Sequence, residues 1–203
     1  MENFYDYIEK GGIIFSILLV LSAVGLTLIT YKFIEINFIN DLNLQSFEQD
    51  LIDSSNISDF KRLLDLKPSS EKKIFLIETL DIIEANTSKA QKDKEIEFIL
   101  QQKYLKSQKF LPSLEIIAQV SPLIGLLGTV IGMIDSFNEL ELGGSLVDPS
   151  ILAGGIWTAL LTTAMGLIVA IPALISHYFL DKKLTNSIQS SSVFFTKLIN
   201  KSN

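Results

Sequence analysis

The sequence predicts an all-α integral membrane protein with three transmembrane helices and a helical cytoplasmic region. Residues 11–31, 116–134 and 149–180 contain no Asp, Glu, Lys or Arg. The shortest of these stretches reaches about 28 Å as a helix, close to the thickness of a bilayer's hydrocarbon core. The 203-residue chain is 48% hydrophobic, and its apolar residues gather in these blocks. The polar remainder is too short to cover three such helices in a water-soluble protein.

The first apolar stretch is interpreted as a retained transmembrane helix. A cleaved signal peptide would begin with a basic cluster and carry a shorter apolar run. Here Glu2, Asp6 and Glu9 precede the run, with Lys10 as the one base. The third stretch has 32 residues, more than a span needs, so its helix is expected to tilt or to project beyond the membrane.

The distribution of Lys and Arg predicts the orientation of the spans. Eleven of the seventeen basic residues lie within residues 61–109, and four follow the third span. The connection at residues 135–148 has none. Because basic residues favour the cytoplasmic side, we expect an amino terminus outside the cytoplasm and a carboxy terminus inside it. The predicted organisation is a periplasmic amino terminus (1–11), transmembrane helices (12–34, 113–138 and 151–180), a cytoplasmic helical region (35–112), a periplasmic loop (139–150) and a cytoplasmic tail (181–203).

The polar segments are also predicted to be helical. In residues 71–111 apolar side chains recur at steps of three and four, and Ser70 can cap the helix that begins at Glu71. The tail is expected to continue the third helix and to pack on the inner helices through its apolar residues, which are Leu184, Ile188, Phe195, Leu198 and Ile199.

Small residues form stripes on the second and third spans. In the second span the spacing is i, i+3 and i+7, which places three glycines on one side of a helix. Membrane helices associate through such stripes, because lipid gives them no hydrophobic reason to meet. We therefore predict helix packing through Gly125, Gly128, Gly132, Gly155, Ala159, Gly166 and Ala170. Pro122 and Pro172 are predicted sites of helix bending.

Four threonines lie within these apolar helices. Thr129 belongs to the second span, and Thr158, Thr162 and Thr163 belong to the third. One such hydroxyl can bond to its own helix, but four on two helices in close contact predict a polar seam or the lining of an ion pathway. Neither helix carries a carboxylate in its middle, so a proton-carrying acid would have to come from another chain.

Several classes of function are disfavoured. The absence of Cys and the single histidine, His177, predict no metal site, no cofactor and no enzyme. A net charge of −6 argues against nucleic-acid binding. For His177, near the inner end of the third span, a structural role is preferred to proton relay.

The motifs SPLIGLLGTVIGMIDSF (121–137) and GGIWTALLTTAMGLIVAIPAL (154–174) resemble the MotA/TolQ/ExbB proton-channel family, in particular its ExbB and TolQ branch. The resemblance implies a homopentamer in a bacterial inner (cytoplasmic) membrane, whose second and third helices line a pore. It also implies a single-span partner, ExbD- or TolR-like, that supplies a proton-carrying aspartate, and a TonB- or TolA-like protein that transmits the work. Thr129 and Thr163 match the family's pore-facing threonines.

One departure from the family pattern concerns Thr158, because many ExbB and TolQ proteins carry glutamate at this position. The partner's aspartate would then have to suffice, and a cluster of hydroxyls leaves sodium open as the coupling ion. The favoured function is a proton channel that energises TonB-dependent import. A TolQ-like role in envelope maintenance and a non-conducting membrane scaffold are the alternatives.

Overall fold

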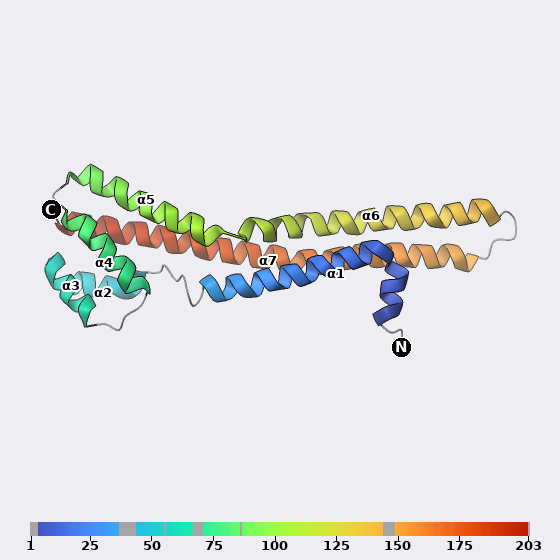
Figure 1. Cartoon of the computed structure of the whole chain (residues 1–203), viewed down its shortest axis with the longest axis horizontal. Helices are drawn as coiled ribbons and strands as arrows, with labels where there is room; N and C mark the ends of the chain where they lie inside the picture. Colours follow the sequence, from blue (N-terminus) through green and yellow to red (C-terminus); the bar gives the residue numbers. More distant parts are fainter. Residues whose placement is uncertain are drawn as a thin grey trace. The chain divides into compact units, whose positions relative to one another are not determined.

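The computed structural model describes residues 4–36, 44–54, 56–66, 71–85, 87–143 and 149–202, and these form helices and no strand. The predicted all-α fold class is confirmed. In chain order the elements are α1 (Phe4–Ile34), the 3₁₀ helix η2 (Leu44–Phe47), α2 (Glu48–Asp53), α3 (Ile57–Asp65), α4 (Glu71–Glu84), α5 (Lys89–Gln108), α6 (Leu111–Gly143) and α7 (Pro149–Ser202) (Figure 1).

Three of these helices are long and apolar enough to cross a membrane, as predicted. Their candidate spans are Gly12–Ile34, Leu111–Leu142 and Leu152–Asn200. Helix α1 is kinked at Gly12, whose φ of 59° lies in the left-handed region that favours glycine. Helix α6 continues to Gly143, so its helical structure extends into the segment predicted as a periplasmic loop.

Some sequence predictions fall on residues outside the described ranges. The proposed cap Ser70 is one of them, as is the middle of the predicted periplasmic loop, residues 144–148. Helix α4 does begin at Glu71.

The chain forms two compact units. Unit 1 comprises Met1–Tyr31 and Phe110–Tyr178, so it holds most of α1, all of α6 and the first part of α7. These three helices run side by side (Figure 1), and α6 and α7 meet at a small apolar core that α1 covers. That core consists of Leu114, Ile117, Ala118, Val169 and Ala173, packed against Leu21, Leu28 and Ile29.

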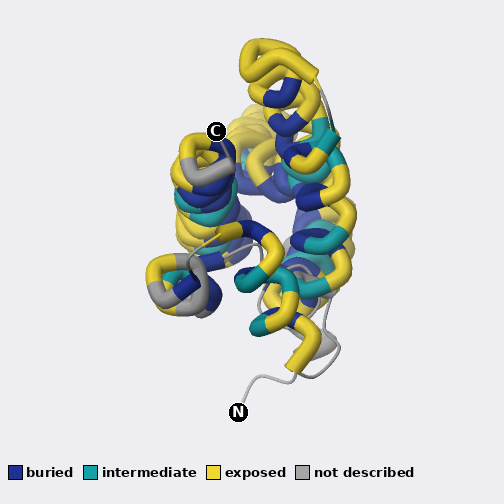
Figure 2. The backbone as a smooth tube through the Cα atoms, turned by 90° about the vertical axis from the view of Figure 1, so that its left-hand side faces the viewer, coloured by how far each residue is buried: buried dark blue, intermediate teal, exposed yellow. Residues whose placement is uncertain are grey.

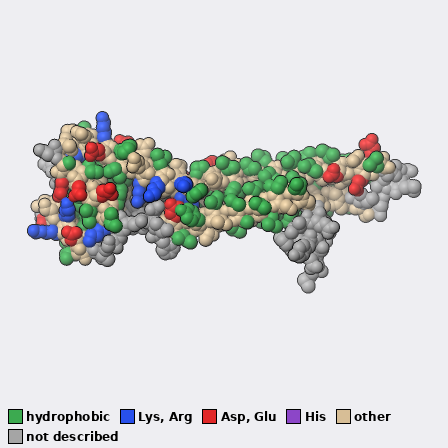
Figure 3. Space-filling model, in the orientation of Figure 1, with side chains coloured by type: hydrophobic (Ala, Val, Ile, Leu, Met, Phe, Trp, Pro, Cys, Tyr) green, Lys and Arg blue, Asp and Glu red, His purple; other side chains and the backbone are tan. Residues whose placement is uncertain are grey.

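The outside of unit 1 is apolar. Large hydrophobic side chains such as Leu126, Leu160 and Ile168 are exposed, and hydrophobic atoms cover most of the face of unit 1 seen in Figure 3. A surface of this kind is costly in water and favourable in lipid. It agrees with membrane insertion of all three spans.

Unit 2 comprises Lys32–Lys109 and Phe179–Asn203 and packs like a water-soluble domain. Its buried core joins aromatic and aliphatic side chains of η2, α3, α4, α5 and the end of α7. Phe195 packs edge-to-face against Phe75 and Phe194, with centroids 5.8 Å apart in both pairs. Helices of this unit alternate buried and exposed positions (Figure 2), and charged side chains gather over its surface (Figure 3).

The carboxy-terminal tail is helical and amphipathic, as predicted. It is the second half of α7, which continues from the third span without interruption. Leu184, Phe195, Leu198 and Ile199 are buried, and Ile188 is half-buried. Phe195, Leu198 and Ile199 belong to the core of unit 2.

A buried lysine joins the end of α1 to the end of α5 within unit 2. The Lys32 ammonium donates to the Glu35 carboxylate at 2.6 Å and to the Ser107 carbonyl at 2.9 Å. Lys32 is fully buried, and Glu35 is nearly so. Since an unpaired buried charge is strongly destabilising, these contacts are what allow a lysine at this position.

Candidate functional site

Helices α6 and α7 approach each other closely at two positions where glycine faces backbone. A Cβ added to Gly125 would lie 2.8 Å from the Thr162 carbonyl oxygen, and one added to Gly166 would lie 2.7 Å from that of Ser121. The Gly166 position would also meet the Cα of Gly125 at 3.2 Å. Backbone atoms cannot rotate away as a side chain can, so only glycine fits at both positions without moving a helix.

The contact continues toward the carboxy end of α6, where side chains replace backbone as neighbours. A Cβ on Gly128 would lie 2.5 Å from the Thr162 hydroxyl, and one on Gly155 would collide with the hydroxyl of Ser136. At Gly132 the nearest atom is the Ala159 Cβ at 3.4 Å, an ordinary contact. The remaining members of the predicted stripe, Ala159 and Ala170, are buried.

Two of the four threonines lie in this contact and bind the same carbonyl. The hydroxyls of Thr162 and Thr163 both donate to the Gly125 carbonyl at 3.2 Å. Thr162 also lies 2.7 Å from the Ala159 carbonyl of its own helix. A hydroxyl has one hydrogen, so Thr162 shares its bond, whereas Thr163 has Gly125 as its acceptor. Thr163 is therefore the clearer polar link between α7 and α6.

Thr129 and Thr158 lie elsewhere. The Thr129 hydroxyl donates to the Leu126 carbonyl of its own helix at 2.7 Å. Thr129 also lines a shallow groove of about 610 Å³ on α6, with Met133, Phe137 and Glu141 among its neighbours. Thr158 is half-buried, and its hydroxyl makes no hydrogen bond to the described residues.

The structure of one chain thus separates the four predicted ion-pathway residues into distinct surroundings. Among the described residues, no hydrogen bond joins two of their hydroxyls. Their predicted role in ion conduction remains a prediction that concerns an assembled channel.

Pro122 and Pro172 lie inside α6 and α7, respectively, and both helices continue through them. Because proline lacks an N–H, the carbonyls one turn earlier lose their usual helical partner. Pro122 also adjoins the close contact, since a Cβ on Gly166 would lie 3.3 Å from its Cα. The predicted bending at the two prolines stays a prediction.

Sequence reasoning missed a polar cluster at the Leu111 end of α6. The Nδ1 atom of His177 lies 3.1 Å from the Leu111 carbonyl oxygen, and its Nε2 lies 4.0 Å from Oε2 of Glu115. Gln119 donates to the other carboxylate oxygen of Glu115 at 3.1 Å. The sequence signal was available, because Glu115 is the only Asp, Glu, Lys or Arg in residues 110–134.

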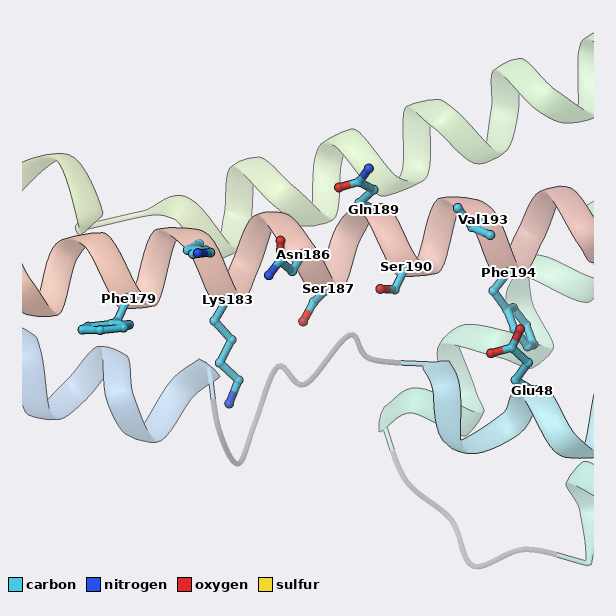
Figure 4. A pocket seen from close by; sticks show the side chains of 10 residues that line it. Glu48, Phe179, Lys183, Asn186, Ser187, Gln189, Ser190, Val193 and Phe194 are labelled. Atoms are coloured by element: carbon cyan, nitrogen blue, oxygen red, sulfur yellow. The ribbon is translucent and has the colours of Figure 1, made fainter.

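A polar pocket of about 900 Å³ lies in unit 2 along α7, between residues 179 and 194, and Glu48 of α2 contributes to its lining. Lys183, Ser187 and Ser190 project toward the same side of α7, whereas Gln189 projects toward the other (Figure 4). None of the predicted ion-pathway residues lines this pocket. The run of Asn, Gln and Ser in residues 186–192 was the corresponding signal in the sequence.

The described residues place no group of three or more His, Cys, Asp or Glu where it could hold a metal ion. Three apolar spans, two of them in glycine-mediated contact with hydroxyls beside it, define a multi-span helical membrane protein. The chain belongs to the MotA/TolQ/ExbB proton channel family, whose pattern matches residues 67–192, more than half of the sequence.

Individual relatives bear ExbB and TolQ names. The chain is 45% identical to biopolymer transport protein exbB1 of Vibrio cholerae over 60 residues, which is 30% of this chain and 26% of that protein. It is 41% identical to the Tol-Pal system protein TolQ of Haemophilus influenzae over 78 residues, 38% of this chain and 33% of the relative. Biopolymer transport protein ExbB of Aquifex aeolicus is 35% identical over 106 residues, 52% of this chain and 64% of the relative. The chain covers less than two thirds of the length of each of these relatives.

Proposed function

We propose that this chain is the ion-channel subunit of an inner-membrane motor that converts a proton gradient into work at the outer membrane. In its ExbB-like form, the motor energises TonB-dependent import. The observation that carries the proposal is the family match over residues 67–192, which includes all of α6 and the predicted span of α7. Relatives named biopolymer transport proteins support it.

In this proposal, several copies of the chain, five by analogy with the family, surround the helix of an ExbD- or TolR-like partner. The amino terminus is periplasmic and the carboxy terminus cytoplasmic, in keeping with the positive-inside rule. The glycine contact holds α6 against α7, and the partner supplies the proton-carrying aspartate. Thr129, Thr158, Thr162 and Thr163 contribute hydroxyls to the ion pathway.

Thr158 stands where many family members have glutamate, and its hydroxyl is the one of the four without an intrachain bond to the described residues. It is therefore available to a partner, to water or to an ion. The Thr163 hydroxyl is engaged by the Gly125 carbonyl at 3.2 Å. To contribute to conduction, the Thr163 hydroxyl would have to release the Gly125 carbonyl, or its oxygen would have to accept a hydrogen bond or bind an ion through its lone pairs while the bond to Gly125 persists.

The test is energised uptake of an iron–siderophore or cobalamin in a deletion strain. The strain is complemented with the wild type, Thr163→Val or Thr163→Ser at equal membrane levels. Serine keeps the hydroxyl and valine keeps the shape, so we expect uptake with the wild type and serine and at least a tenfold loss with valine. Cross-linking of the complex must show equal assembly, because valine also removes the bond to Gly125.

Two outcomes would contradict the proposal in different ways. Full uptake with Thr163→Val, together with full uptake when Thr129→Val is added, would favour a passive scaffold. Intact uptake in a deletion strain without a paralogue would exclude the import role. Envelope leakage in that strain would instead support the second candidate, a TolQ-like role, which the similarity to the Haemophilus influenzae TolQ protein favours.

A further inference from the structure

We propose that His177 and Glu115 form a proton-binding site at the Leu111 end of α6, and that the bound proton ties α6 to α7. The inference deepens the proposed function, since it assigns a proton site within the proposed channel subunit. It rests on the geometry of unit 1 and on the distribution of ionisable side chains along its helices.

His177 and Glu115 are exceptional within the apolar stretches of unit 1, because their side chains can ionise near neutral pH. Residues 11–31 of α1 and residues 149–178 of α7 contain no Asp, Glu, Lys or Arg, and residues 110–134 contain only Glu115. His177 is the sole histidine of the chain. The one carboxylate and the one imidazole in these stretches lie on different helices, yet they face each other at 4.0 Å. Ionisable groups at membrane depth are costly, and they usually serve ion movement.

The two ring nitrogens of His177 both face acceptors. The Leu111 carbonyl, 3.1 Å from Nδ1, can only accept a hydrogen bond, so Nδ1 must carry the hydrogen. A neutral ring then presents the lone pair of Nε2 to the negative carboxylate of Glu115. A proton on Nε2 replaces this repulsion with attraction between opposite charges, so the site is built to accept one.

Neighbouring groups hold the carboxylate in place. Gln119, one turn along α6, donates to Oε1 of Glu115 at 3.1 Å, which leaves Oε2 directed at His177. His177 is about 20% exposed and Glu115 about 48% exposed, so the pair lies at the surface of unit 1, where a proton donor can reach it. The nearest other titratable side chains along these helices include Asp181, one helical turn after His177 on α7, and Lys109, just before α6; others are Tyr31, Lys32 and Tyr178.

The start of α6 is held by a second contact. Phe110 has a φ of 73°, a strained conformation for a bulky residue, and its ring packs edge-to-face on Tyr31 with centroids 5.9 Å apart. Phe110 immediately precedes Leu111, the residue that His177 binds. Strained residues persist where surrounding contacts fix them, and the protonated His177–Glu115 pair adds such a contact from α7.

Proton binding at this site is a simple transfer. A hydronium ion gives its proton to Nε2, so one O–H bond breaks, one N–H bond forms and a water molecule remains. Release reverses the step into water at the same end of the helices. The ring then keeps its Nδ1 hydrogen on the Leu111 carbonyl and loses its attraction to Glu115.

The test uses the full chain in lipid nanodiscs with isotope-labelled histidine, purified without a histidine tag. His177 is then the only imidazole signal in NMR. We expect the neutral ring to carry its hydrogen on Nδ1. We also expect Glu115→Gln to lower the ratio of protonated to neutral imidazole about two- to fivefold at a fixed pH between 6 and 7, the range for an exposed ion pair. The control Glu139→Gln removes the same charge from an exposed position on α6 and should leave the ratio unchanged.

A neutral ring with its hydrogen on Nε2, or an equal ratio in the wild type and Glu115→Gln, would overturn the proposal. So would an equal change in Glu139→Gln. These results concern protonation of the isolated chain, and the uptake experiment with Thr163 variants does not depend on them. Failure of the proton site and failure of the channel assignment are therefore distinguishable.

Discussion

The helices within unit 1 and the helices within unit 2 are packed by opposite means. In unit 1, α6 and α7 approach each other because side chains are missing, and a Cβ at Gly166 would lie 2.7 Å from a backbone oxygen. In unit 2, the helices join through large side chains such as Phe60, Phe195 and Leu198, all nearly or fully buried. Water drives apolar side chains together, whereas lipid does not. Helices in lipid associate through van der Waals contact at close range, which favours small residues.

This difference predicts that unit 2 is destabilised when a buried side chain is truncated. Phe195→Ala would leave a cavity beside Phe75 and Phe194 and should reduce the free energy of unfolding by about 3–5 kcal/mol. Limited proteolysis of the purified chain would report this as earlier cleavage within unit 2. The control Val193→Ala truncates a side chain that is 52% exposed and should change the cleavage rate little. Equal effects of the two variants would contradict the assignment of the core.

Unit 1, in contrast, should be destabilised when a single methyl group is added at the contact between α6 and α7. Gly166→Ala places a Cβ against the Ser121 carbonyl and the Gly125 Cα, and this overpacking should cost about 1–3 kcal/mol. The matched change Gly154→Ala meets nothing within 4 Å and should stabilise the helix by up to about 1 kcal/mol. Thermal unfolding in nanodiscs measures both. The two variants should move the melting temperature in opposite directions, and a common direction would refute the close contact.

The smallest effect is expected at the surface of unit 2. Lys61 pairs with Asp81 at 3.1 Å and with Glu84 at 3.3 Å. Hydrogen bonds, first to Asp81 and then to Glu84, raise the pKa of Lys61 above its usual 10.5. Lys61→Gln should cost about 0.2–1 kcal/mol, since its side chain is partly exposed and salt screens the pair.

The pH dependence of this small contribution has a definite sign. Because folding raises the pKa of Lys61, the stabilisation is fully present below pH 10.5 and declines as pH rises through the higher pKa of the folded state. Denaturation of the wild type and of Lys61→Gln is compared below and above pH 10.5 and at low and high salt. The first comparison checks the sign of the pH dependence, and the second checks the electrostatic origin of the stabilisation. A difference between the two proteins that grows with salt would contradict an electrostatic origin.

Much of the architecture followed from the sequence, because the signals were local and repeated. Long uncharged runs predicted the spans, and three- and four-residue steps predicted the amphipathic tail whose Phe195 and Leu198 are buried. The motifs around Gly125 and Thr163 led to the family that the comparison then matched over residues 67–192. Each of these features lies within one helix and depends on periodicity, which is readable without a partner.

What only the tertiary structure decided is which groups meet across helices. The sequence grouped Thr129 with Thr163, yet Thr163 binds the Gly125 carbonyl and Thr129 bonds within α6. It treated His177 as an isolated residue, although Glu115, 62 positions earlier, lies 4.0 Å away. A helical repeat fixes the face on which a side chain lies. The axial register between two helices, in contrast, depends on packing along their whole length. At Gly125 and Gly166 this register is set by backbone contact.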